Sequence, residues 1–141
     1  QTCALPIFQV WFGPHATHIG GLLTQPAPIE LSMATKGLIA RLRDRFVGHH
    51  DGIGDDAFDR AFAVKASNLS TAASLFDTGA RQALLDAEGH GLHPAVDAHS
   101  IHLRRFSQGG QFDSEDMIES DFRTAARLAR VVGESFARAS R

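Results

Sequence analysis

An apolar stripe near the C-terminus constrains the fold more than any other feature of the chain. Its members recur every three or four residues: Ile118, Phe122, Ala125, Ala129, Val132 and Phe136. This spacing places side chains on one face of an α-helix. Ser114, followed by the acidic Glu115 and Asp116, is typical of a helix N-terminus. A long helix with one apolar face must bury that face, and we expect it to cover a β-sheet.

Two strands are predicted in the N-terminal third. Residues 8–12 are aromatic and β-branched and stop at Gly13-Pro14, whereas residues 28–34 alternate between apolar and polar side chains. We expect these two strands to pair as a hairpin. The stretch between them contains Gly20-Gly21 and two prolines, which predicts an irregular connection.

Further elements follow in short succession. Helical spacing predicts a helix over 36–46 with Thr35 as its cap, and residues 59–67 are predicted as a strand after a loop at 47–56. Asn68 or Ser70 can cap a helix that ends near residue 76, and a helix over 78–88 is expected to stop at Gly89 and Gly91.

Two strands, 94–97 and 100–106, are predicted next, joined by a tight turn at Ala98-His99. Most links between neighbouring strands are too short for a helical crossover. The sequence therefore predicts an α+β fold: a mainly antiparallel sheet with helices packed on one face and a long C-terminal amphipathic helix.

Composition excludes several classes of protein. The 141 residues suit one domain, and 43% hydrophobic and 21% charged residues are ordinary values for a globular chain. A net charge of −2 does not favour nucleic acid as a partner. Cys3 is the single cysteine, so disulfides and cysteine-ligated metals are not expected. No apolar run reaches the length of a membrane-spanning helix.

One cluster of residues carries ligands that metals prefer. Imidazole and carboxylate groups gather in His49, His50, Asp51, Asp55, Asp56 and Asp59. Their spacing matches no metal motif, because there is no HExxH sequence and no EF-hand pattern. A metal-dependent hydrolase using this cluster is one hypothesis. In the other, no cofactor binds, and Asp55 caps the turn before Phe58 in a solvated loop.

A second set of histidines lies between the later elements. His90, His93, His99 and His102 would meet only if the predicted 94–106 hairpin folds back on the loop before it, and solvated side chains are the commoner outcome. On that hairpin, Ile101 and Leu103 share one face while His102 and Arg104 share the other. No Gly-x-Ser-x-Gly motif is present.

The order of several short motifs resembles a known family. Gly54-Asp55, Phe58-Asp59 and Phe62-Ala63-Val64 precede a helix and Leu84-Leu85, within residues 28–137. In this order they resemble an uncharacterised bacterial domain family, many members of which carry transmembrane helices upstream. The resemblance implies an α+β fold and transfers no catalytic role to any residue. The motif itself predicts that Gly54 takes an unusual turn conformation and that Asp59 bonds backbone amides.

Residues 1–7 are expected to be foreign to the domain. Gln-Thr-Cys-Ala-Leu-Pro-Ile resembles the translation of a sequencing adapter, CAG ACG TGT GCT CTT CCG ATC. We therefore expect residues 8–141 to be a single α+β domain, truncated at its N-terminus.

The expected function follows from a complete core pattern without a convergent catalytic set. We expect a non-enzymatic domain for interaction or ligand sensing, the C-terminal soluble part of a membrane-associated bacterial protein. It should be cytoplasmic and anchored to a membrane only through a segment upstream of this sequence. Its expected partner is a protein or a small ligand that the sequence does not identify.

Overall fold

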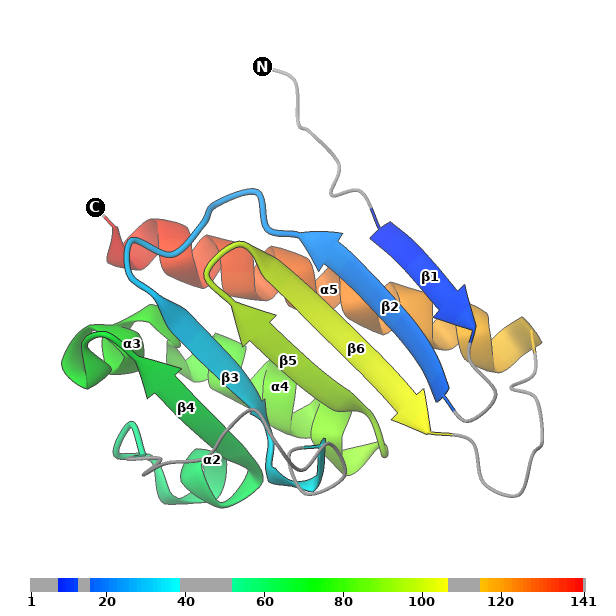
Figure 1. The fold of residues 1–141 in the computed structure, drawn as a ribbon, viewed down its shortest axis with the longest axis horizontal. Helices are drawn as coiled ribbons and strands as arrows, with labels where there is room; N and C mark the ends of the chain where they lie inside the picture. Colours follow the sequence, from blue (N-terminus) through cyan, green and yellow to red (C-terminus); the bar gives the residue numbers. More distant parts are fainter. Residues whose placement is uncertain (1–7, 13–15, 39–51, 107–114, 141) are drawn as a thin grey trace.

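A computed structural model describes residues 8–12, 16–38, 52–106 and 115–140. Within these residues, six strands form one antiparallel sheet in the order β1-β2-β6-β5-β3-β4 (Figure 1). The strands are β1 (Phe8–Phe12), β2 (Ala16–Leu22), β3 (Leu31–Thr35), β4 (Phe62–Ala66), β5 (His93–Asp97) and β6 (Ser100–Phe106). The helices are α2 (Asp56–Ala61), α3 (Leu69–Leu75), α4 (Thr78–Gly89) and α5 (Glu115–Ala139).

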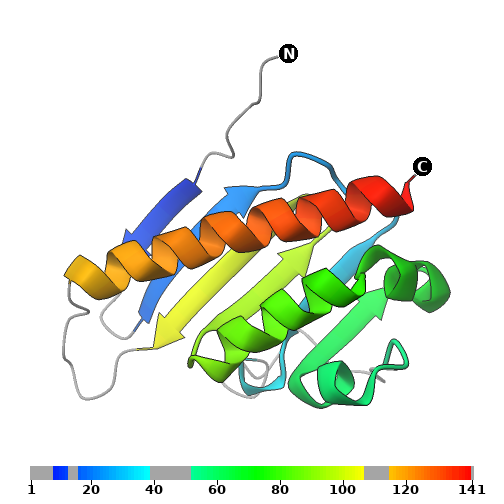
Figure 2. The ribbon, with the colours of Figure 1, turned by 180° about the vertical axis from the view of Figure 1, so that it is seen from behind.

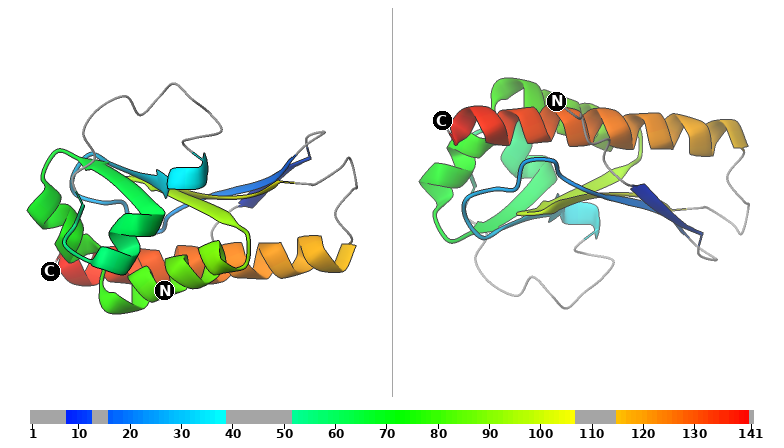
Figure 3. Two further views of the ribbon diagram at one scale, coloured as in Figure 1. Left: turned by 90° about the horizontal axis from the view of Figure 1, so that it is seen from below. Right: turned by 90° about the horizontal axis from the view of Figure 1, so that it is seen from above.

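The helices α4 and α5 cover one face of the sheet, as the sequence predicted (Figure 2). Residues 36–38 form a helical turn on the opposite face, where Thr35 Oγ1 accepts the Leu38 N–H at 3.1 Å (Figure 3). Thr35 is therefore the cap that was expected, while the remainder of the helix predicted over 36–46 lies outside the described residues. The structure confirms the α+β class and the antiparallel sheet.

The core lies between the sheet and the covering helices. Four phenylalanines from four segments join there, with ring centroids 4.7 Å apart for Phe58 and Phe62, 5.8 Å for Phe58 and Phe76, and 5.5 Å for Phe76 and Phe136. All four are at most 2% exposed. Full burial of a large apolar side chain contributes about 1.5–3 kcal/mol, so this cluster fixes α5 against the end of the sheet where α2 and α3 lie.

The hairpin predicted from residues 8–12 and 28–34 was wrong. β1 pairs with β2, the segment expected to be irregular, and β3 pairs with β4 and β5. One of the two glycines that argued against a strand at 16–22, Gly20, has a packing role. A Cβ on Gly20 would lie 3.0 Å from the Trp11 ring and 2.9 Å from His102 Nδ1, so a strand that passes beneath these rings requires glycine there.

The strand predicted over 59–67 was wrong in its first part. Residues 56–61 form α2 and only Phe62–Ala66 form β4. Asp55 is the N-cap of α2 and accepts a hydrogen bond from the Phe58 N–H at 3.2 Å. This cap starts a helical turn that alternation along the sequence does not reveal.

The stripe on α5 is also turned slightly from its predicted position. Phe122 is 38% exposed, whereas Asp121 is 3% exposed and faces the interior. Its carboxylate accepts two hydrogen bonds from Arg105 on β6, at 2.7 and 2.9 Å. A paired arginine explains how a carboxylate occupies the buried face of this helix.

Replacing Arg105 by alanine should lower the free energy of unfolding by about 3 kcal/mol, because the buried Asp121 carboxylate loses its partner. The matched change in the exposed ion pair Arg123–Glu119, Arg123→Ala, should cost less than about 0.5 kcal/mol. Urea unfolding followed by circular dichroism measures both values, and equal losses would contradict this account.

Candidate functional site

The face of the sheet opposite α4 and α5 carries the polar side chains of its central strands. Alternation explains this, because the residues on the helix-bearing face are apolar and buried: Ile19, Val96, Ile101 and Leu103. Their neighbours point the other way: His18 and Gly20 on β2, Asp97 on β5, and Ser100, His102 and Arg104 on β6. We call this surface the helix-free face; it is turned toward the reader in Figure 1.

Four side chains on the helix-free face form a continuous hydrogen-bonded chain. The Ser100 hydroxyl donates to Asp97 Oδ2 at 2.7 Å and lies 3.0 Å from His102 Nε2. On its other side, His102 Nδ1 lies 2.9 Å from His18 Nε2. Three strands, β5, β6 and β2, therefore contribute to one polar chain that runs across the sheet.

The chain has one consistent set of donors. A carboxylate only accepts, so the single hydrogen of the Ser100 hydroxyl goes to Asp97. The hydroxyl oxygen must then accept from His102 Nε2–H, which leaves His102 Nδ1 to accept from His18 Nε2–H. His102 is neutral in this arrangement, because one of its ring nitrogens donates and the other accepts, whereas His18 needs only its Nε2–H.

The order of the groups differs from that of a nucleophilic triad. In such a triad the imidazole lies between the carboxylate and the serine and removes the hydroxyl proton. Here Ser100 lies between Asp97 and His102 and gives its hydrogen to the carboxylate. The arrangement orients the two histidines and does not activate the serine.

Electrostatics agrees with neutral histidines. Burial, the positive charge of Arg104 and the neighbouring His102 lower the pKa of His18 to about 4. Burial also lowers the pKa of His102, helped by Arg104 and opposed by Asp97. Burial alone would raise the pKa of Asp97, but hydrogen bonds from Ser100 and the backbone amides of His99 and Ser100 outweigh it and lower that pKa.

Two hollows flank the histidine pair. The first, of about 370 Å³, is lined by Gln9, Trp11, Gly20, Gly21, Leu22, Ser100 and His102. The Trp11 ring stacks on His18 with centroids 4.8 Å apart and is 46% exposed. The second hollow, of about 230 Å³, lies on the other side of His102 and reaches Arg104, Ala34 and Leu38. His102 lines both hollows, so the pair forms the ridge between them.

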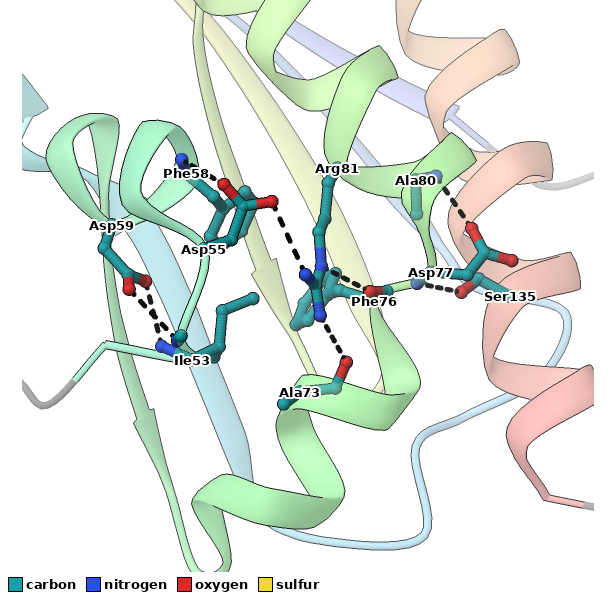
Figure 4. A network of polar contacts seen from close by, with 11 residues as sticks. Ile53, Asp55, Phe58, Asp59, Ala73, Phe76, Asp77, Ala80, Arg81 and Ser135 are labelled. Atoms are coloured by element: carbon teal, nitrogen blue, oxygen red, sulfur yellow. Dashed lines mark hydrogen bonds and ion pairs between the residues drawn. The ribbon is translucent and has the colours of Figure 1, made fainter.

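The metal cluster predicted from sequence is seen only in part. His49, His50 and Asp51 lie outside the described residues. Asp55 caps α2 and forms an ion pair with Arg81 at 3.4 Å, and Asp59 accepts from the backbone N–H groups of Ile53 and Gly54 at 2.9 and 3.1 Å (Figure 4). Of the three described carboxylates, Asp55 and Asp59 thus serve the local backbone, as the scaffold interpretation of the motif predicted, and Asp56 is exposed in the first turn of α2. Gly54 has φ of +96°, the turn conformation expected of it.

Arg81 holds this corner to the next helix. Its guanidinium donates to the carbonyl oxygens of Phe76 and Ala73, each at 2.7 Å, at the C-terminal end of α3 (Figure 4). Backbone carbonyls at a helix end lack partners within the helix, and a cation satisfies them well. The contacts of Asp55 and Arg81 therefore have a structural role, which is to cap α2 and to satisfy the carbonyl groups at the end of α3.

The second set of histidines does not converge. His90 Nδ1 lies 2.6 Å from the Asp86 carbonyl oxygen, His93 Nδ1 lies 2.8 Å from Thr35 Oγ1, and His99 is exposed. In the part of the chain that the structure describes, no group of three or more histidine, cysteine, aspartate or glutamate residues is placed to hold a metal. His102 instead meets His18, a residue that sequence analysis did not select.

Comparisons with known proteins support the fold. No protein-family model matches the chain, and no curated protein matches it. Among solved structures, it resembles the crystal structure of the mycobacterial trehalose monomycolate transport factor A, TtfA, with a TM-score of 0.55 and 12% sequence identity. The likeness covers 92% of this chain but 65% of that chain, so this sequence spans less than two thirds of that protein. At this identity the likeness shows a shared fold alone.

Among the residues that the structure describes, no helix combines the length and the apolar character needed to cross a membrane.

The histidine pair predicts a specific pH dependence. The pKa of His18 is about 4 in the folded chain, against 6.5 as its ordinary value, so unfolding takes up a proton between these two pH values. The free energy of unfolding should be level above pH 7 and should fall as the pH drops from 6.5 to 4. The lowered pKa values of Asp97 and Asp77 start from 3.8, so these carboxylates act at lower pH.

Urea unfolding at a series of pH values measures this fall, and NMR titration of the imidazole protons assigns it. The variant His18→Gln/His102→Gln should show a flatter profile between pH 6.5 and 4. Titration of both histidines near pH 6.5 in the folded protein would contradict the buried, neutral pair.

Proposed function

We propose that this domain is a non-enzymatic ligand-binding domain and that the helix-free face around Trp11 and the His18–His102 pair is its binding site. The observation that carries the proposal is the order Asp97–Ser100–His102–His18. It orients two imidazoles between two hollows, and it directs the Ser100 hydrogen to Asp97, so that this serine is not activated.

The lining of the hollows indicates the class of ligand. Trp11, Gly20, Gly21 and Leu22 give the first hollow a mainly apolar floor, and Ala34, Leu38 and Ala95 do the same for the second. Ligand sites in proteins combine such apolar surfaces with a few placed polar groups. An elongated molecule with an apolar body fits a surface of this kind.

Arg104 indicates the charge of the ligand. It lies beside the second hollow, and no carboxylate of the described residues forms an ion pair with it. Arg104 is the one lysine or arginine among the residues that line this hollow. Asp97 also lines it, but its carboxylate already accepts from the Ser100 hydroxyl and from the backbone amides of His99 and Ser100. We therefore propose an amphipathic anion, with its acidic group at Arg104 and its apolar part extending over His102 toward Trp11.

The setting of the domain is part of the same proposal. We propose that it is the C-terminal, cytoplasmic part of a membrane-associated bacterial protein. The motifs within residues 28–137, which resemble a family with transmembrane helices upstream, support this setting, and the protein of shared fold is named as a transport factor. An amphipathic ligand is consistent with that setting.

Binding is measurable through Trp11, the single tryptophan of the chain. Titration with decanoate should change the Trp11 fluorescence, and the uncharged decanol should bind at least about tenfold more weakly because it cannot pair with Arg104. Arg104→Gln should weaken decanoate binding to a similar extent. Arg130→Gln, on the exposed side of α5 across the sheet, is the matched control and should bind as the parent chain does. Equal effects of the two arginine changes would contradict the site.

A metal-dependent hydrolase is the alternative, and it depends on His49, His50 and Asp51 together with Asp55 and Asp59. Within the described residues, both aspartates are engaged with backbone amides, which favours the binding domain. Metal analysis of the purified chain separates the two proposals. We expect no stoichiometric metal; one metal per chain that is lost in His49→Ala and Asp55→Ala would favour the hydrolase instead.

A further inference from the structure

Arg104 and His18 are neighbours on the helix-free face. They lie directly opposite each other in the antiparallel pair of β6 and β2, and both line the second hollow. Opposed residues of an antiparallel pair have Cβ atoms about 5 Å apart. An acidic group held by Arg104 therefore lies beside the imidazole of His18, and the ligand atoms next to that group come to this ring.

One ring nitrogen of His18 is an acceptor that the protein does not use. Its Nε2–H donates to His102 Nδ1 at 2.9 Å, because His102 gives its own hydrogen to Ser100. Burial, Arg104 and His102 lower the pKa of His18 to about 4, so the ring carries a single hydrogen at neutral pH. The other nitrogen, Nδ1, is then an acceptor, and no donor among the described residues bonds to it. Its lone pair is left to solvent or to a ligand.

The other side-chain acceptors of the second hollow are engaged or distant from Arg104. Both ring nitrogens of His102 are used within the hydrogen-bonded chain. Asp97 and Ser32 lie opposite each other on β5 and β3, and Asp97 is hydrogen-bonded to the first residue of β6, four residues before Arg104. Four residues of a strand span about 13 Å. Among the side chains that line the hollow, His18 is therefore the acceptor next to Arg104.

We propose that the ligand carries a hydrogen-bond donor, an amide N–H or a hydroxyl, within two or three bonds of its acidic group. The acidic group pairs with Arg104 while the donor bonds to His18 Nδ1, and their short separation follows from the pairing of the two residues across β6 and β2. N-acyl amino acids and hydroxy fatty acids share this chemistry. The inference rests on the function proposed above and narrows its amphipathic anion to this class.

An acid without such a donor binds more weakly for a physical reason. In the free protein, water satisfies the lone pair of the half-buried His18, and a bound acyl chain displaces that water. A ligand that offers no donor then leaves a desolvated acceptor unpaired, which costs more than a hydrogen bond in the same place contributes. The site should therefore prefer an acid with a donor over its matched analogue by about tenfold.

Isothermal titration calorimetry at pH 8, where His18 is neutral, tests this preference with two matched pairs of ligands. N-decanoylglycine should bind about tenfold more tightly than N-decanoylsarcosine, whose amide nitrogen carries a methyl group in place of the hydrogen. The second pair is 2-hydroxydecanoate and decanoate. A preference in either pair supports the proposal and identifies the donor. Equal affinities within both pairs would overturn this inference and leave the proposed site in place, whereas no binding of any of the four acids would overturn both.

A variant of His18 assigns the preference to its ring nitrogen. His18→Phe keeps a ring against Trp11 and removes the acceptor, so N-decanoylglycine should bind to it only as tightly as N-decanoylsarcosine does. His90→Phe, at the end of α4 on the other side of the sheet, is the matched control and should keep the preference of the parent chain. A preference that persists in His18→Phe would trace it to the size of the methyl group and would overturn the proposal.

Nitrogen-15 NMR of the parent chain tests the same contact without a variant. The resonance of His18 Nδ1 should be that of an unprotonated imidazole nitrogen in the free protein. It should shift when N-decanoylglycine binds and should stay close to its free position with N-decanoylsarcosine. The same shift with both ligands would contradict a hydrogen bond to this nitrogen.

Discussion

The burial of Phe76 holds the architecture together. Its ring lies between those of Phe58 and Phe136, so it joins the corner at α2 to the long helix α5. Its carbonyl oxygen accepts from Arg81, and the next residue donates its backbone N–H to Ser135 on α5. The same hydroxyl donates to Leu75 O. One short link between α3 and α4 is thereby fixed by packing and by hydrogen bonds together. All of this packing falls on one face of the sheet and leaves the other face to carry polar groups.

The elements that local chemistry determines were predictable from the sequence. The stripe on α5, the capped helix α4 with its stop at Gly91, and the turn between β5 and β6 all depend on residues a few positions apart. β2 was not predicted because its Gly20 packs against Trp11 on β1 and His102 on β6, and no local sequence pattern reveals a contact across three strands. Likewise, α2 depends on the Asp55 cap, which outweighs the alternation of the residues after it.

The site was predictable only in fragments. Alternation on β6 correctly placed His102 and Arg104 on one face, but His18 lies 84 positions away from His102. Since the sequence around His18 was taken for a loop, its side chain had no predicted direction. The denser group of histidines and aspartates attracted attention by composition, yet Asp55 and Asp59 are occupied with backbone amides. Density of ligand types along a chain therefore says little until the strands that bring distant residues together are known.

A side chain at Gly20 would disturb the candidate binding surface without disturbing the hydrophobic core. A methyl group there would project from the helix-free face into Trp11 and His102 and would not reach the core on the other side. The backbone conformation of Gly20 does not itself require glycine, because its φ lies outside the left-handed region, so the rings of Trp11 and His102 are what exclude a side chain there. Sequences that share this core could thus gain or lose the stacked Trp11–His18–His102 surface by a single codon change, and drift at this position would alter what the domain recognises while its architecture stayed the same.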